Sequence, residues 1–210
     1  MSKNSLRALK AAVFLLCLVP LGKLAMEAFG LAGMSLGANP IEELLHRCGK
    51  WGLNFLLITL AITPLRRITG WGWLIRFRRM LGLYAFFYTL LHFVVYAVLD
   101  QGLALNYIVE DIIERPYITL GILALLMLIP LAVTSTNGWM RRLGKRWQKL
   151  HKLVYVIAIL AVWHFYWQVK QDILEPLIYA GILVLLFAIR GWYRRQARKR
   201  IQLRETRSPS

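Results

Sequence analysis

Four histidines are the residues of this sequence best suited to chemistry: His46, His92, His151 and His164. Each stands in or beside a long apolar run. An ionisable side chain in an apolar span is costly, so such a residue is a functional candidate by default. Imidazole is also a common axial ligand of haem iron. The histidines therefore direct attention to a metal-centred cofactor.

Two of these histidines share one expected depth. His92 lies 13 residues beyond Arg79, and His164 lies 12 residues beyond Lys152. If both stretches are helices that run in the same direction, both imidazoles lie roughly 18–20 Å above these basic residues. We therefore predict that His92 and His164 bind the iron of one haem. The alternative is that each imidazole is a buried group bonded to a carbonyl or hydroxyl.

The other two histidines are expected near the ends of apolar runs. His151 shares its depth with three cations, Arg78, Arg79 and Lys152. Together these four residues could contact a haem propionate, a quinone or a flavin phosphate, or His151 could be an ordinary interfacial histidine. A second haem at this depth would need a histidine in place of Arg79. We interpret His46 as interfacial.

Aromatic side chains crowd the two candidate ligands. They could pack against a porphyrin, or they could form an aromatic belt at the membrane interface together with ordinary helix packing. They are Phe86, Phe87, Tyr88, Phe93, Tyr96, Trp163, Phe165, Tyr166 and Trp167.

Long apolar runs must position these side chains. The 210 residues are 58% hydrophobic, whereas a soluble domain is about 45–50% apolar. A spanning helix needs about 20 mostly apolar residues, and six runs meet this condition. We predict an all-α integral membrane protein, a six-helix transmembrane bundle that forms one domain over residues 1–210, with a basic tail at 194–210. The six runs cover about 9–29, 42–63, 80–99, 117–134, 150–169 and 177–193.

The formal net charge of +17 follows the same pattern. A soluble protein with this charge would suggest a nucleic-acid partner. Here most Lys and Arg residues fall on alternate connections between apolar runs, so membrane topology explains them and no nucleic-acid partner is expected. The positive-inside rule places these connections and both termini in the cytoplasm.

Two other classes of function compete with electron transfer. A transporter could use buried histidines as proton relays, but transporters usually show paired repeats or broken helices, which are not evident in the sequence. A non-redox membrane scaffold would need no histidines at matched depth. A purified haem protein would be red, which distinguishes electron transfer from both alternatives.

Several motifs resemble one family along nearly the whole chain. The first is Arg-Arg-Met-Leu-Gly-Leu at 78–83, which leads to Leu-Leu-His at 90–92. The second is Arg-Pro-Tyr-Ile-Thr at 115–119. The longest occupies 134–151, and His-Phe-Tyr-Trp follows at 164–167. In this order they resemble the MsrQ (YedZ) family, the haem-binding membrane subunits of bacterial protein-methionine-sulfoxide reductase systems in the ferric-reductase-like transmembrane superfamily.

The resemblance implies a function and a location. Members of this family lie in the bacterial inner membrane, hold haem b and have been associated with FMN. They pass electrons from the respiratory quinone pool to a periplasmic molybdopterin enzyme that reduces methionine sulfoxide in oxidised envelope proteins. His92, His151 and His164 match the histidines of the family. The resemblance thus implies an electron-transfer subunit rather than the catalytic subunit.

The expected electron donor follows from the short C-terminal stretch. About 17 residues follow the sixth apolar run, too few for a folded flavin and nicotinamide domain. We therefore expect electrons to come from quinol in the bilayer or from a separate cytoplasmic flavin reductase, and not from NADPH bound to this chain.

Overall fold

The structure, a computed structural model, describes residues 2–169 and 172–205, which form helices and contain no strand. Six helical segments are long and apolar enough to cross a membrane. The predicted fold class, an all-α six-helix transmembrane bundle, is therefore confirmed. The long helices are α1 (Lys3–Ala28), α2 (Pro40–Thr69), α3 (Arg78–Val94), α5 (Pro116–Val133), α8 (Leu153–Gln168) and α9 (Leu174–Glu205).

Shorter elements extend or connect these helices. The π-helical turn η3 (Val95–Asp100) continues α3, and α7 (Lys145–Leu150) leads into α8, so each of these pairs makes one candidate span. His151 therefore lies at a turn between α7 and α8 instead of within a continuous helix. The remaining short elements are η1 (Leu31–Gly33), η2 (Gly72–Arg76), α4 (Leu105–Glu114) and α6 (Asn137–Leu143).

Local sequence signals set the limits of α2. The Asn39 side chain accepts a hydrogen bond from the backbone N–H of Glu42, and Pro40 takes the first helical position, where a missing N–H costs nothing. The helix ends at Gly70, whose φ of 75° is left-handed and is easily adopted only without a Cβ. Helix α9 continues through the basic stretch from 194 to Glu205. Residues 206–210 of the expected tail lie outside the described residues.

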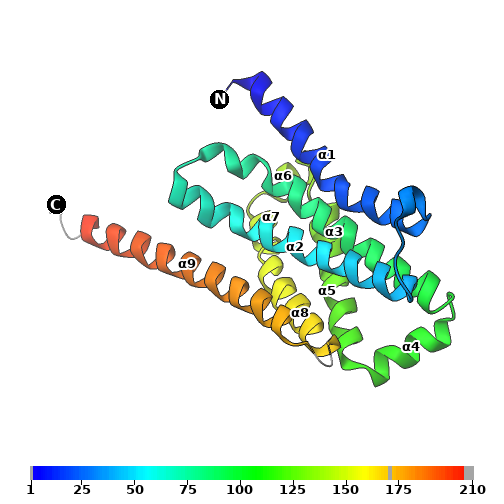
Figure 1. The fold of residues 1–210 in the computed structure, drawn as a ribbon. Helices are drawn as coiled ribbons and strands as arrows, with labels where there is room; N and C mark the ends of the chain where they lie inside the picture. The colour runs from blue at the N-terminus through cyan, green and yellow to red at the C-terminus, as the bar shows by residue number, and fades with distance from the viewer. Residues whose placement is uncertain (1, 170–171, 206–210) are drawn as a thin grey trace.

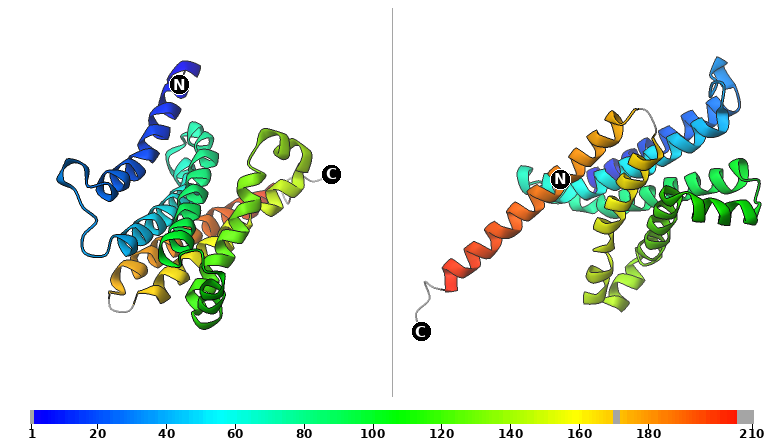
Figure 2. Two further views of the ribbon diagram at one scale, coloured as in Figure 1. Left: turned by 90° about the vertical axis from the view of Figure 1, so that its right-hand side faces the viewer. Right: turned by 90° about the horizontal axis from the view of Figure 1, so that it is seen from below.

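Helix α2 lies at the centre of the bundle and packs against α3, α8 and α9, while α5 packs against α8 and α3 (Figures 1 and 2). Helix α1 lies against α2 and α3, and two tyrosines of α3 hold it there. The Tyr88 hydroxyl donates to the carbonyl of Cys17, and the Tyr84 hydroxyl donates to the carbonyl of Phe14.

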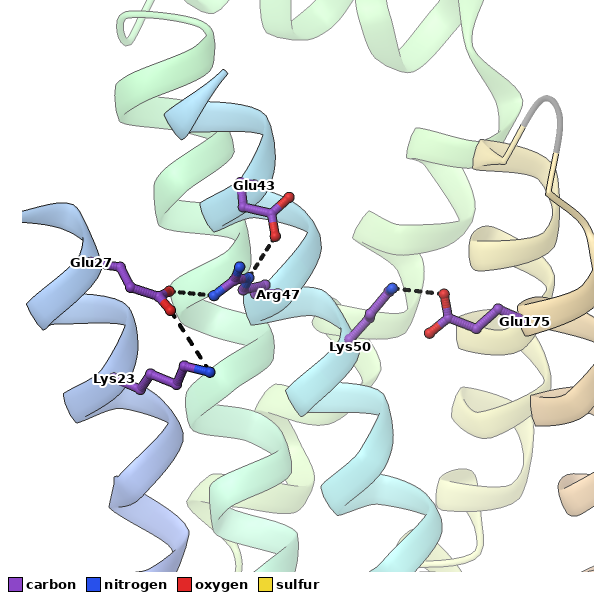
Figure 3. Close-up of polar contacts among 6 residues, drawn as sticks. All are labelled: Lys23, Glu27, Glu43, Arg47, Lys50 and Glu175. Atoms are coloured by element: carbon purple, nitrogen blue, oxygen red, sulfur yellow. Dashed lines mark hydrogen bonds and ion pairs between the residues drawn. The ribbon is translucent and has the colours of Figure 1, made fainter. Parts of the chain in front are cut away.

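The two ends of the bundle carry opposite charge. Four carboxylates, Glu27, Glu43, Asp111 and Glu175, mark what we call the acidic end, where Arg47 pairs with Glu27 and Glu43 and joins α1 to α2 (Figure 3). Arg47 and Glu43 are partly exposed, so their pair contributes about 1 kcal/mol or less, whereas the Glu27 carboxylate is buried. We call the opposite end, where α2 and α9 carry their arginines and α3 begins, the basic end.

Candidate cofactor site

Two histidines face each other between α3 and α8. The ring centroids of His92 and His164 are 6.1 Å apart, and the planes meet at 78°. A metal–imidazole bond is about 2 Å long, and the ring centroid lies roughly 1 Å farther from the metal, so two opposed ligands of one metal have centroids about 6 Å apart. The structure thus brings together the two histidines that the sequence placed at one depth, at a separation that suits a shared metal.

The orientation of each imidazole is set by a backbone carbonyl. His92 Nδ1 lies 2.8 Å from the carbonyl oxygen of Leu45 on α2, and His164 Nδ1 lies 2.6 Å from that of Tyr117 on α5. A carbonyl oxygen can only accept, so each Nδ1 carries the hydrogen and each neutral ring keeps a lone pair on Nε2. Metal-binding histidines use such bonds to fix their tautomer and orientation.

A glycine lies beside each of these imidazoles. Gly49 follows Leu45 by one helical turn, and a Cβ added to it would lie 3.0 Å from Nδ1 of His92. Gly121 follows Tyr117 in the same way, and its Cβ would lie 3.0 Å from His164. This distance is shorter than an ordinary van der Waals contact, so the ring would have to give by a few tenths of an ångström, and glycine at both positions avoids that displacement.

A mostly apolar cavity adjoins the two rings, with polar groups that come largely from the acidic end. The histidine that sequence analysis interpreted as interfacial, His46, lines this cavity, and its Nε2 lies 2.6 Å from the side-chain nitrogen of Gln168. Lys50 also lines the cavity and forms a 2.7 Å ion pair with Glu175 (Figure 3). The apolar lining includes Leu53, Leu56, Phe93, Ile122, Leu125 and Phe165.

A second cation of the cavity, Arg115, is held by a buried carboxylate. Asp111 is 8% exposed, accepts a 3.0 Å hydrogen bond from the Tyr96 hydroxyl, and lies 3.2 Å from Arg115 Nε. The negative charge of Asp111 raises the pKa of the Arg115 guanidinium, so Arg115 stays charged. The sequence offered no signal for Lys50 and Arg115 as cavity residues, because their convergence depends on packing.

The other predicted site residues lie elsewhere. His151, Arg78, Arg79 and Lys152 are at the basic end and do not line this cavity. The His151 ring stacks on Trp147 with centroids 3.8 Å apart, and both its nitrogens are buried without a hydrogen-bond partner. Arg79 donates to the Asn137 side chain, and Lys152 is exposed. No contact links these four residues to the paired histidines.

The aromatic residues divide between the two readings offered by the sequence. Phe93, Tyr96 and Phe165 line the cavity. Trp163 and Trp167 are exposed on the outer face of α8, as residues of an interfacial belt are. Position relative to the cavity therefore separates the two groups.

The fold and the site together define a class: a multi-pass helical membrane protein with two facing imidazoles between its spans. Among the described residues no group of three or more His, Cys, Asp and Glu side chains could hold a metal ion. Two imidazoles alone suit a metal whose other ligands come from a macrocycle, as in haem.

Comparisons with known proteins agree with this class. Residues 48–162 match the family described as "Ferric reductase like transmembrane component". A protein of Xanthomonas euvesicatoria pv. vesicatoria (strain 85-10), named "Protein-methionine-sulfoxide reductase heme-binding subunit MsrQ", is 49% identical over 100% of this chain and 97% of its own length. Relatives of the same name are 52% identical in Xanthomonas campestris pv. campestris (strain 8004), over 95% of this chain and 94% of their own, and 48% identical in Herminiimonas arsenicoxydans, over 95% and 91%. The chain belongs to the MsrQ family within the ferric-reductase-like transmembrane proteins.

Proposed function

We propose that this chain is a transmembrane electron-transfer subunit that takes electrons from the quinone pool of a bacterial inner membrane. It passes them through haem b to a periplasmic molybdopterin methionine-sulfoxide reductase, which repairs oxidised periplasmic proteins. The observation that carries this proposal is the pair of opposed imidazoles, 6.1 Å apart, with both Nδ1 atoms bonded to carbonyls. The names of its relatives support the haem and the methionine-sulfoxide reductase.

The residues of the site fit a haem. His92 and His164 would hold the haem iron, because each presents an unprotonated Nε2 in a mostly apolar setting. Lys50 and Arg115 would pair with the propionates, since they are the cations that line the cavity at its acidic end. A bound b-type haem supplies one-electron redox chemistry. The names of the relatives mention heme and no flavin, so the FMN implied by the resemblance stays a prediction.

The proposed direction of transfer depends on topology. We propose that the basic end and both termini are cytoplasmic, because Lys and Arg are retained on that side of a membrane. The paired histidines then lie nearer the periplasm, with Leu45 and Tyr117 in the first turns of helices that begin at the acidic end. A periplasmic acceptor would thus be close to the haem, and a cytoplasmic one would face most of the membrane thickness.

Reconstitution tests the proposal. The purified full-length protein should show a b-type reduced-minus-oxidised haem spectrum. In liposomes a quinol should reduce the haem, and the periplasmic reductase with oxidised substrate should reoxidise it. NADPH without another protein should leave the haem oxidised.

Two results would contradict the mechanism. A colourless protein after growth with ample haem would exclude the haem and favour the transporter or scaffold. Reduction by NADPH alone, or a reduced haem that the periplasmic reductase leaves unchanged, would exclude the proposed donor or acceptor.

A further inference from the structure

Helix α4 joins the end of the third span to the start of α5 at the acidic end of the bundle (Figure 1). The buried residue of this helix is a carboxylate, Asp111, whereas the apolar residues Leu105, Val109 and Ile113 are exposed. Burial of a charge is costly unless the charge is paired and hydrogen-bonded. The position of Asp111 therefore suggests a role other than folding.

Both oxygens of the Asp111 carboxylate are engaged. Oδ2 accepts a 3.0 Å hydrogen bond from the Tyr96 hydroxyl and a 3.1 Å hydrogen bond from the side-chain nitrogen of Gln101. Oδ1 lies 3.2 Å from Nε of Arg115. Two neutral donors thus fix the carboxylate through one oxygen, and its other oxygen holds the arginine.

The π-helical turn η3 supplies the support for Asp111. Tyr96 lies four residues after His92, and the backbone N–H of Gln101 donates to the carbonyl of Tyr96, five residues earlier. Such wide turns occur within α-helices mostly at functional sites. Here the wide turn directly follows a candidate ligand and carries a donor to Asp111.

Arg115 extends the influence of Asp111 into the cofactor cavity. Arg115 and Tyr96 line this cavity, whereas Asp111 does not. The guanidinium of Arg115 also lies within interaction range of Tyr117, whose carbonyl orients His164. These contacts connect the helix that carries one candidate ligand to the residue that orients the other.

We propose that Asp111 is a positioning residue, which holds the Arg115 guanidinium in the cavity for pairing with a haem propionate. The Arg115 side chain is 53% exposed, and ordering a long side chain costs conformational entropy. The contact with Asp111 meets this cost before the cofactor binds. A guanidinium has five N–H donors, so it can bind a second carboxylate while its Nε faces Asp111. The proposal rests on the haem of the proposed function.

The charge of Asp111 distinguishes positioning from a direct effect on the cofactor. Asp111→Asn keeps the shape of the side chain and removes its negative charge. A direct effect predicts slower release of haem, because a negative charge near anionic propionates is lost. Positioning predicts faster release, because the guanidinium is no longer held. The two mechanisms therefore predict changes of opposite sign.

The test measures haem release from the purified full-length protein to an excess of a soluble haem-binding protein. Arg115→Gln should speed release about fivefold, the size expected for a partly exposed charge pair, and Asp111→Asn about threefold. In the Arg115→Gln protein, Asp111→Asn should add less than about 1.5-fold, because no guanidinium remains to be positioned. The control Glu110→Gln removes an exposed carboxylate of the same helix and should leave the rate unchanged.

The midpoint potential of the haem gives a second readout. It should fall in Asp111→Asn and in Arg115→Gln, because a positive charge beside a propionate favours the reduced iron. A direct effect of the Asp111 charge would raise the potential, and a purely structural role would leave it unchanged. A structural role would also speed release by the same factor with and without Arg115.

A milder variant keeps the test decisive if Asp111→Asn does not fold. Tyr96→Phe keeps the ring and removes one donor to Asp111, so it should speed release less than Asp111→Asn does, and only when Arg115 is present. Slower or unchanged release, or equal effects in both backgrounds, would overturn the positioning role. If the unchanged protein holds no haem, both this proposal and the proposed function are wrong. If it holds haem and these variants release haem at the unchanged rate, only the positioning role is wrong.

Discussion

Helices α2 and α3 hold His92 in the same way that α5 and α8 hold His164. In each pair, a carbonyl of the first helix accepts from a histidine 47 residues later. A glycine one turn beyond that carbonyl contacts the ring, and a phenylalanine follows the histidine and lines the cavity. The second set follows the first by 72 residues: 117 against 45, 121 against 49 and 164 against 92. The site is thus built from two copies of one local arrangement.

The two copies differ in their surroundings. The first belongs to the centre of the bundle, where α2 is covered on several sides, and a Cβ on its second glycine, Gly52, would lie 2.7 Å from the Thr89 hydroxyl. In the second copy, Ala124 stands at the position of Gly52, and Ala161 stands at the position of Thr89. Helix α5 also has a mean hydropathy of 2.2, against 1.3 for α2. The two copies therefore share the arrangement around the histidine. Their remaining contacts differ, because α2 and α3 form a buried helix pair, whereas α5 and α8 form a pair that is more exposed to lipid.

The copies diverge at the basic end. The same shift of 72 residues relates His151 to Arg79, so only one copy has a histidine at this position. Arg79 binds Asn137, and His151 stacks on Trp147. The pairing of imidazoles is thus found at the level of His92 and His164 and is not repeated at the level of His151.

Loss of either ligand should have the largest effect and should be equal in the two copies. His92→Ala and His164→Ala should each reduce haem per protein at least about tenfold, because one open axial position weakens retention of the cofactor. The reduced-minus-oxidised spectrum, normalised to protein, measures this. Full haem content in either variant would show that its histidine is not a ligand.

The glycines beside the ligands should reveal the difference between the copies. Gly49→Ala and Gly121→Ala should both lower haem content severalfold, because a Cβ at 3.0 Å displaces the ring. We expect the greater loss for Gly49→Ala, since the central pair has less freedom to separate. Gly181→Ala is the control, because its Cβ would have no neighbour within 4 Å. Equal effects would mean that both pairs are equally rigid.

The contact specific to the first copy should affect stability more than haem binding. Gly52→Ala should destabilise the protein by about 1–3 kcal/mol through overpacking, seen as a drop of several degrees in the unfolding temperature. Thr89→Ala in the same chain should recover part of the loss, because the hydroxyl contact disappears while the backbone contact at 3.2 Å remains. Gly82→Ala, with its nearest neighbour at 3.7 Å, should be nearly neutral. Full recovery in the double variant would contradict a backbone contribution.

Substitution at the basic end should have the smallest effect on haem. His151→Ala should keep the haem spectrum and the haem content of the unchanged protein, because the His151 ring lies away from the cavity beside His92 and His164. Complete loss of haem in this variant would mean that the ligand pair has been assigned wrongly.

The sequence by itself determined the membrane class, the six helices and the common depth of His92 and His164. Length, hydropathy and a rise of about 1.5 Å per residue are local properties, so they can be read along the chain. The resemblance also identified the family, which the comparisons confirm. The sequence did not reveal that the same arrangement of carbonyl, glycine and histidine occurs twice. A backbone carbonyl carries no sequence signal, and the two copies share few residue types.

Only the tertiary structure decided which groups converge. It brought the rings of His92 and His164 to 6.1 Å from each other, and it brought His46, Lys50 and Arg115 to one cavity. The rotation of a helix about its axis does not follow from its apolar length. It is set by packing against neighbours, here at the glycines that let α2 and α5 come within contact distance of the imidazoles.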